Sequence, residues 1–293
     1  MKKLVISVLC ITFIFSGCRK DPNVELEGDR DILIYFTPQE SLLKSVGTTQ
    51  ENQVNTINVY GVEDGGSADW LFNLTALPTG SGYSYLLSRK YTSLYAIANH
   101  GSLTIPTGST TKAALENLTG SFASEPASPF LMSGIATNLN KTTKTVTIEL
   151  VRVVAKVDIN ASGFDSGTAI SVTVKSTPNL GYVFGRSPFA IPSGGAFAKI
   201  DYLAVSNTSA SKTLYVAENV GATTPTQFLI SGTVQGKSAS HTFSLTRSNT
   251  AINIVRNTYC VVTVTATTHD NFTVNITVKA WDDVTNLDTV IVP

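Results

Sequence analysis

The sequence predicts an all-β protein made of two tandem β-sandwich domains with one short helix in the first. Val and Thr, which favour strands, recur along the whole chain. Short apolar or alternating stretches are separated by Gly, Pro and Asn turn signals, and they divide into two halves of about seven strands each. Only the segment 110–118 has the apolar spacing of a convincing helix.

The chain begins with a predicted lipoprotein signal peptide, residues 1–17. Met1-Lys2-Lys3 is a basic head, an apolar run follows to Phe15, and Ser16-Gly17 precede Cys18. A small pair before a cysteine is typical of the bacterial site where the leader is cut and the cysteine is lipidated. A transmembrane anchor is disfavoured because a span needs about 20 apolar residues. We therefore predict lipidation at Cys18 and a flexible tether over residues 18–30.

The first ordered strand is predicted at Ile32, Leu33, Ile34, Tyr35 and Phe36. Both of its faces are apolar, so we expect burial on both sides. Pro38 should end the strand. The polar segment 41–55, which contains Gly47, is predicted to be an exposed loop.

The N-terminal domain is predicted to span residues 31–160. Its other predicted strands are 54–62, 70–74, 83–87, 91–98, 130–135 and 145–159. The helix at 110–118 has an apolar stripe formed by Ala113, Ala114, Leu115 and Leu118, and Gly120 offers a stop.

The C-terminal domain is predicted to span residues 161–293. Its predicted strands are 169–175, 213–216, 227–234, 238–245, 255–266, 272–281 and 287–292. The segment 272–280 alternates apolar with polar residues, which indicates a strand with one dry and one wet face.

Composition and motifs argue against several functions. Charged residues make up 14% of the chain and the net charge is zero, with no basic stripe, so nucleic acid is not an expected partner. Cys10 leaves with the leader and Cys18 is lipidated, which leaves Cys260 alone and predicts a buried, inert thiol.

We find no phosphate-binding loop, dinucleotide fingerprint or nucleophile elbow in the sequence. The three histidines, His100, His241 and His269, lack metal-ligand spacing. The acid pairs Glu63-Asp64 and Asp282-Asp283 are typical of solvated carboxylates. We therefore predict no cofactor, no metal and no enzymatic activity; a secreted hydrolase would lack a nucleophile and base.

Several motifs occur in a characteristic order after the lipidation signal. They are Tyr95-Ala96-Ile97-Ala98-Asn99, Phe130-Leu131-Met132-Ser133-Gly134, Leu150 to Asp158, Leu214 to Asn219, and Arg256-Asn257-Thr258-Tyr259. With these motifs and a closing strand that runs into Trp281, the chain resembles the fimbrillin family of Bacteroidota. The resemblance implies two transthyretin-like β-sandwiches and an outer-membrane lipoprotein of the cell surface and fimbrium. Implied partners are other fimbrial subunits, either copies of this chain or paralogues, together with host or bacterial surface ligands.

The resemblance also implies assembly by donor-strand exchange, in which a protease removes the first strand and a strand of the next subunit replaces it. The candidate removable strand is Ile32 to Phe36. The candidate donor is the segment 287–292, with Leu287, Thr289, Val290, Ile291 and Val292, extended by the strand ending at Trp281. Two alternatives stay open: a permanent first strand, and a last strand that completes its own domain.

One departure from the family pattern concerns the cleavage site. Family members are cut after arginine in the loop following the first strand, but residues 37–55 contain no arginine and only one basic residue, Lys44. Either a lysine-tolerant protease cuts at Lys44, or the chain keeps its first strand as an anchor or accessory subunit. The sequence leaves the roles of stalk, tip and anchor open.

Most of the motif residues are predicted to be structural. Arg152 and Lys156 lie four apart on one predicted strand, so they should share a face, either pairing with Glu149 or Asp158 or remaining solvated. Asn99 and Asn219 each follow a strand, where asparagine favours a turn.

An alternative function is a monomeric surface lipoprotein that binds glycans. Its candidate aromatic platform is Trp70, for which an ordinary core position is the competing interpretation.

Overall fold

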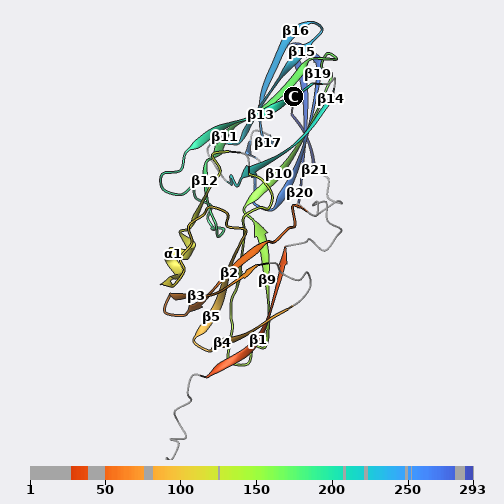
Figure 1. Cartoon of the computed structure of the whole chain (residues 1–293). Coiled ribbons are helices and arrows are strands. Elements are labelled where there is room, and N and C mark those ends of the chain that lie inside the picture. Colours follow the sequence, from red (N-terminus) through yellow and green to blue (C-terminus); the bar gives the residue numbers. More distant parts are fainter. Residues whose placement is uncertain are drawn as a thin grey trace, which may run out of the picture.

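The computed structural model describes residues 28–38, 50–75, 82–124, 126–206, 209–220, 224–247, 250–251, 253–280 and 288–292. Strands are the main secondary structure of these residues, and the helix among them, α1 (Lys112–Glu116), has five residues. The predicted all-β sandwich class is therefore confirmed. Figure 1 shows two halves stacked end to end, with β1 at one tip and β15 and β16 at the other.

The N-terminal half is a sheet with the strand order β4-β1-β9-β8-β5-β2-β3-β6. Its strands, with the separately paired β7, are β1 (Asp29–Pro38), β2 (Thr56–Glu63), β3 (Ser67–Thr75), β4 (Tyr83–Ser88), β5 (Tyr91–Ala98), β6 (Ser109–Thr111), β7 (Thr119–Ser121), β8 (Met132–Ala136) and β9 (Thr145–Arg152). The layer β4-β1-β9 packs on the layer β8-β5-β2-β3 around one core. The layers join through β8 and β9, where Met132 pairs with Arg152 and Ser133 pairs with Val151.

The C-terminal half is a sandwich of a five-stranded sheet, β14-β10-β19-β20-β21, and a four-stranded sheet, β13-β11-β15-β16. Its elements are β10 (Val154–Ser162), β11 (Ala169–Pro178), β12 (Leu180–Tyr182), β13 (Phe197–Ser206), β14 (Ser209–Ala217), β15 (Gln227–Val234), β16 (Lys237–Ser244), β17 (Thr246–Arg247), β18 (Thr250–Ala251), β19 (Thr258–Thr268), β20 (Asn271–Ala280) and β21 (Asp288–Val292). Inward-facing apolar residues of the two sheets form one continuous core.

The change from one half to the other differs from the prediction. The predicted strand 145–159 is two strands, because β9 ends at Arg152 and β10 begins at Val154. β9 pairs with β1 and β8, whereas β10 pairs with β14 and β19. The sheets therefore change at Val153 and not at residue 160, and the whole of β10 belongs to the C-terminal half.

The start of the ordered chain also differs from the prediction. Residues 29 and 30 were expected in the tether, but they form the beginning of β1. The predicted signal peptide and the rest of the tether up to residue 27 lie outside the described residues.

A crossing segment of the C-terminal half covers the outer face of the N-terminal sheet. β12 pairs with β7, so that Gly181 lies opposite Gly120. Val183 and Phe184, just after β12, are buried in a second core with Leu115 of α1. This core explains why β2 is buried on both faces.

The predicted helix is shorter than expected. The short strand β6, residues 109–111, overlaps the predicted start of the helix, and the short strand β7, residues 119–121, follows its predicted end. Thr111 caps α1 by accepting a hydrogen bond from the Ala114 amide at 3.1 Å. Among the described residues, no helix has the length and apolar character needed to cross a membrane.

Candidate functional site

The predicted removable strand lies inside a sheet and uses both of its edges. β1 runs antiparallel to β4, with Ile32 opposite Tyr85, and parallel to β9, with Leu33 opposite Thr145. Within the predicted segment, Ile32 to Ile34 pair with β4 and Leu33 to Phe36 pair with β9, so the two ladders overlap at Leu33 and Ile34. β4 occupies the edge of the sheet, and β1 is its neighbour there.

The side chains of β1 are buried unequally. Ile32 and Ile34 are fully buried in the N-terminal core, whereas Leu33, Tyr35 and Phe36 are half-buried. The expectation of burial on both sides is therefore right for one face only. Gly82 lies close over the second face: a Cβ added there would be 2.7 Å from Leu33 Cδ1 and 2.9 Å from Tyr35 Cζ.

The beginning of β1 holds a buried cation with carbonyl partners. Arg30 donates from Nη1 to the Asn140 carbonyl at 2.7 Å and from Nη2 to the Tyr91 carbonyl at 3.0 Å. Its Nε is buried and has no partner. Burial, followed by repulsion from Arg89, lowers the pKa of Arg30. β1 therefore carries an incompletely satisfied charge, which costs stability.

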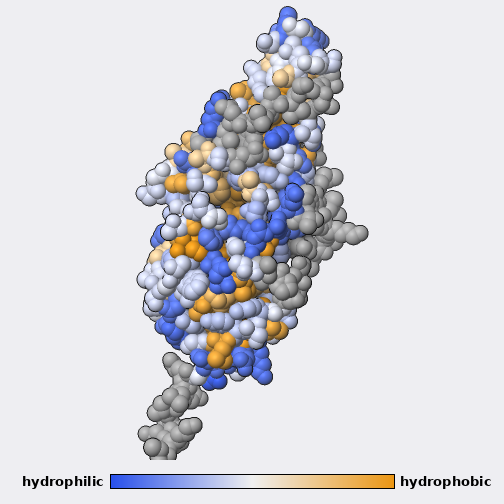
Figure 2. Space-filling view, in the orientation of Figure 1, coloured by the Kyte–Doolittle hydropathy of each residue, from blue (hydrophilic) through white to orange (hydrophobic). Residues whose placement is uncertain are grey.

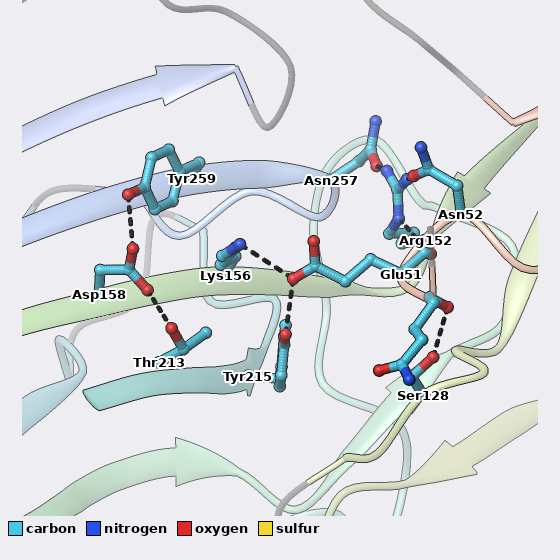
Figure 3. Close-up of polar contacts among 11 residues, drawn as sticks. Glu51, Asn52, Ser128, Arg152, Lys156, Asp158, Thr213, Tyr215, Asn257 and Tyr259 are labelled. Carbon is cyan, nitrogen blue, oxygen red and sulfur yellow. Dashed lines mark hydrogen bonds and ion pairs between the residues drawn. The ribbon is translucent and has the colours of Figure 1, made fainter. Parts of the chain in front are cut away.

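The segment just before β2 is docked through Glu51. Residues 50–55 precede β2, and Gln50, Gln53 and Asn55 are exposed as predicted. Glu51 is only 2% exposed, so the predicted exposed loop is wrong at this residue. The Glu51 carboxylate lies 2.9 Å from Lys156 Nζ and accepts a hydrogen bond from Tyr215 Oη at 2.6 Å (Figure 3). Lys156 and Tyr215 are opposite residues of β10 and β14, so the carboxylate of the N-terminal half binds the C-terminal sheet.

Arg152 binds the backbone of the same segment. It is fully buried at the end of β9, and its Nε donates to the Glu51 carbonyl at 3.1 Å. Its Nη1 donates to Asn257 Oδ1 at 2.6 Å, and its Nη2 donates to Asn52 Oδ1 (Figure 3). The expected carboxylate partners, Glu149 and Asp158, are therefore wrong, and Arg152 and Lys156 lie on different strands.

Asp158 belongs to a second polar group on the same sheet, next to the first, because the Tyr259 ring centroid lies 5.5 Å from Lys156 Nζ. It accepts hydrogen bonds from Thr213 Oγ1 and Tyr259 Oη, both at 2.6 Å (Figure 3). Burial, with the Asp158 bond as the next cause, raises the pKa of Tyr259. This group offers a matched comparison, because the hydrogen bonds from Thr213 and Tyr259 to Asp158 stay within the C-terminal sheet.

Asn99 fixes the other end of the docked segment. Its φ of 53° places it in the left-handed region that asparagine tolerates, as the turn prediction requires. The Asn99 Oδ1 accepts from the Asn55 amide, and its Nδ2 donates to the Gln53 carbonyl, both at 2.8 Å.

The sequence offered no local signal for Glu51. Its partners Arg152 and Tyr215 lie 101 and 164 residues further along the chain. A lone glutamate in a polar stretch is typical of exposed loops. Only the packing of β10 and β14 against the segment 50–55 identifies it.

The candidate donor strand lies at the edge of the C-terminal sheet. β21 pairs antiparallel with β20, with Val290 opposite Ile276. In this structure, Thr289, Val290, Ile291 and Val292 complete the sheet of their own domain. Leu287 and Trp281 lie outside the described residues, as do Lys44 and Cys18.

The remaining predicted residues show no catalytic arrangement. Cys260 is buried on β19, and burial raises its pKa to about 12, as expected for an inert thiol. Trp70 is half-buried against the core beneath α1 and donates from Nε1 to Asn58 Oδ1 at 3.1 Å. Within the described part of the chain, no three His, Cys, Asp or Glu side chains gather as metal ligands.

The surface shows scattered apolar residues. In Figure 2, they form small groups between polar residues on the visible face. Of the large exposed apolar residues of the described chain, Leu86, Ile135 and Phe197 lie on three different strands, and Val255 lies outside the strands. This arrangement lends no support to an aromatic glycan platform.

No family model and no curated protein matches this chain. Solved structures do. A candidate cell-adhesion protein from Bacteroides eggerthii has a TM-score of 0.63 at 19% identity, over 87% of this chain and 96% of its own. The C-terminally truncated tip fimbrial protein Mfa3 from Porphyromonas gingivalis has a TM-score of 0.61 at 12% identity, over 86% of this chain and 100% of its own.

A fimbrial assembly protein from Parabacteroides distasonis has a TM-score of 0.57 at 16% identity, over 90% of this chain and 99% of its own. These identities are low, so the likeness concerns the fold. The chain has the fold of fimbrial and candidate cell-adhesion proteins of Bacteroidota, and the resemblance seen in the sequence is confirmed at that level.

Proposed function

We propose that this protein is a fimbrial subunit of the bacterial surface that contributes to adhesion and assembles by donor-strand exchange. The fold shared with fimbrial and adhesion proteins supports the general role. One observation carries the finer proposal: β1 is an internal strand of the N-terminal sheet, while the segment after it is held by a separate set of side chains.

Removal of β1 would open a slot with two unsatisfied edges. β4 and β9 would each lose a ladder of hydrogen bonds, and the core would lose Ile32 and Ile34. Unpaired strand edges and exposed core residues together form a strong acceptor for an added strand. A replacement with the pairing of β1 must run parallel to β9 and antiparallel to β4.

The proposed donor is the C-terminal segment 287–292. β21 is an edge strand, and β20 is its neighbour in the sheet, whereas β1 has a neighbour on each side. Release of an edge strand breaks one ladder, so β21 is the strand that costs less to detach.

The proposed partners are other fimbrial subunits, either copies of this chain or paralogues. Lipid at Cys18 would hold the precursor in the outer membrane, and cleavage at Lys44 would free it from both the lipid and β1. We propose no enzymatic role, since the similar structures are described as fimbrial or adhesion proteins.

The decisive experiment is mass spectrometry of the N-terminus of the protein taken from assembled surface fibres. A chain that starts just after Lys44 supports strand removal, and a Lys44→Gln variant should then stay unpolymerised at the membrane. Two results would overturn donor-strand exchange after cleavage at Lys44. One is fibres whose subunits start at a lipidated Cys18, and the other is a Lys44→Gln variant that polymerises into fibres as the wild type does. A lipidated start would mean that the chain keeps its first strand and is an anchor, an accessory subunit or not a pilin.

A further inference from the structure

The two ends of the connection between β1 and β2 are held in different ways. Upstream, β1 is held by strand pairing and by two isoleucines, and its buried cation Arg30 has an unsatisfied Nε. Downstream, Glu51 forms a buried ion pair with Lys156, whose side chains are 3% and 9% exposed.

The downstream contacts reach across both halves of the molecule. Glu51 binds Lys156 and Tyr215 of the C-terminal sheet, and Arg152 joins the Glu51 backbone to Asn257. Further bonds come from the N-terminal half, where Ser128 Oγ donates to the Gln50 carbonyl at 2.5 Å and Asn99 binds the Gln53 carbonyl. These partners lie on elements other than β1.

We propose that residues 50–55 form a clamp that locks the two halves together and stays docked when β1 is absent. We call this segment, with Lys156, Tyr215 and Arg152, the Glu51 clamp. The part that concerns the loss of β1 rests on the proposed function; the lock between the halves does not.

The physical reason lies in the cost of separating a buried ion pair. If the segment moved away, Lys156 would be left as a buried cation without its carboxylate, and Arg152 would lose its bonds to Glu51 and Asn52. Leaving a buried charge uncompensated is strongly unfavourable. A cut in the preceding connection breaks none of these bonds, so residues 50–55 stay fixed and β2 keeps its register.

Hydrogen exchange of the intact chain tests the lock. In Glu51→Gln and Lys156→Met, the amides of residues 50–55 should exchange at least about tenfold faster than in the wild type. The control Asp158→Asn changes a neighbouring, partly buried carboxylate of the same sheet, and it should leave this exchange unchanged. Tyr215→Phe removes only one hydroxyl and should give a smaller increase.

A double variant separates the ion pair from a general packing effect. Lys156→Met leaves the Glu51 carboxylate uncompensated, so adding Glu51→Gln should slow the exchange relative to Lys156→Met alone. Unchanged protection of β11 and β15 would show that every variant is folded. Wild-type exchange rates in both single variants, or purely additive effects in the double variant, would overturn the clamp.

A cleaved chain separates the clamp from the proposed function. A sequence-specific protease site replaces residues 41–47, and exchange at residues 50–55 is measured before and after cutting. The clamp is supported if residues 50–55 are equally protected before and after cutting in the wild type, and if this protection is lost in Glu51→Gln. Protection that falls on cutting while the β1 fragment leaves would overturn the clamp and keep the proposed function. If the β1 fragment never leaves and is never replaced by another strand while residues 50–55 stay protected, the proposed function is overturned and the clamp stands.

Discussion

Gly134 shows how one residue sets the contact between two strands. It lies on β8, and a Cβ added there would be 2.3 Å from the Glu149 carbonyl oxygen and 2.7 Å from Ile148 Cγ2 of β9. The neighbouring Ser133 Oγ donates to the buried Val183 carbonyl at 2.6 Å. The Met132-Ser133-Gly134 motif is therefore a packing feature: glycine permits the close approach, and serine binds the crossing segment.

We expect Gly134→Ala to destabilise the protein by about 3 kcal/mol, because a methyl group cannot displace a backbone carbonyl without moving a strand. Gly65→Ala is the matched control, since nothing lies within 4 Å of an added Cβ there. Urea unfolding measures the difference. Equal midpoints for the two variants would contradict the packing role.

At the scale of elements, one carboxylate connects three strands of the N-terminal sheet. Asp69 of β3 accepts from Lys90 Nζ and Tyr91 Oη, both at 2.8 Å, and from Ser109 Oγ of β6 at 2.6 Å. The bond from Lys90, followed by those from Ser109 and Tyr91, lowers the pKa of Asp69 to about 2.

This pKa predicts a particular acid sensitivity. Because the folded pKa lies below the ordinary 3.8, Asp69 stabilises the fold above about pH 4, and this stabilisation is lost as the pH falls towards 2. Asp69 is partly exposed, so we expect a contribution of about 1 kcal/mol. Free energies of unfolding between pH 5 and 2 should fall less steeply in Asp69→Asn. Parallel curves for the two proteins would refute the assignment.

Most strands could be predicted from periodicity, but the ends and partners of the elements could not. The predicted 91–98 coincides with β5, and 83–87 lies within β4. The helix shrank to α1 because β6 and β7 pair with β3 and β12, which local apolar spacing does not reveal. β13 was missed altogether, and its pairing with β11 identifies it.

At the scale of the whole molecule, the crossing segment joins the halves through Arg256. This side chain donates from Nη1 to the Val183 carbonyl and from Nη2 to the Tyr182 carbonyl, both at 2.9 Å. Its Nε donates to Glu218 Oε2 at 2.8 Å. Arg256 therefore holds the segment that fills the second core of the N-terminal half.

We expect Arg256→Met to destabilise the protein by about 3 kcal/mol, since Glu218 and two carbonyls lose a largely buried partner. Arg186→Met is the control, because Arg186 is exposed and stacks on Tyr182 at 3.6 Å. Thermal unfolding and hydrogen exchange at β12 should distinguish the two variants. Loss of β12 protection in Arg186→Met alone would contradict the role of Arg256.

The sequence by itself determined the β-rich class and the positions of most strands, because alternation along a strand is a local property. It also identified Asn99 as a turn residue. For Arg152 and Lys156, pairing with carboxylates was one of the two interpretations that the sequence left open. Only the tertiary structure decided that their partner segment is 50–52, that the sheets change at Val153, and that β1 lies between β4 and β9. Partners far apart in the chain are chosen by packing and burial, which no local pattern records.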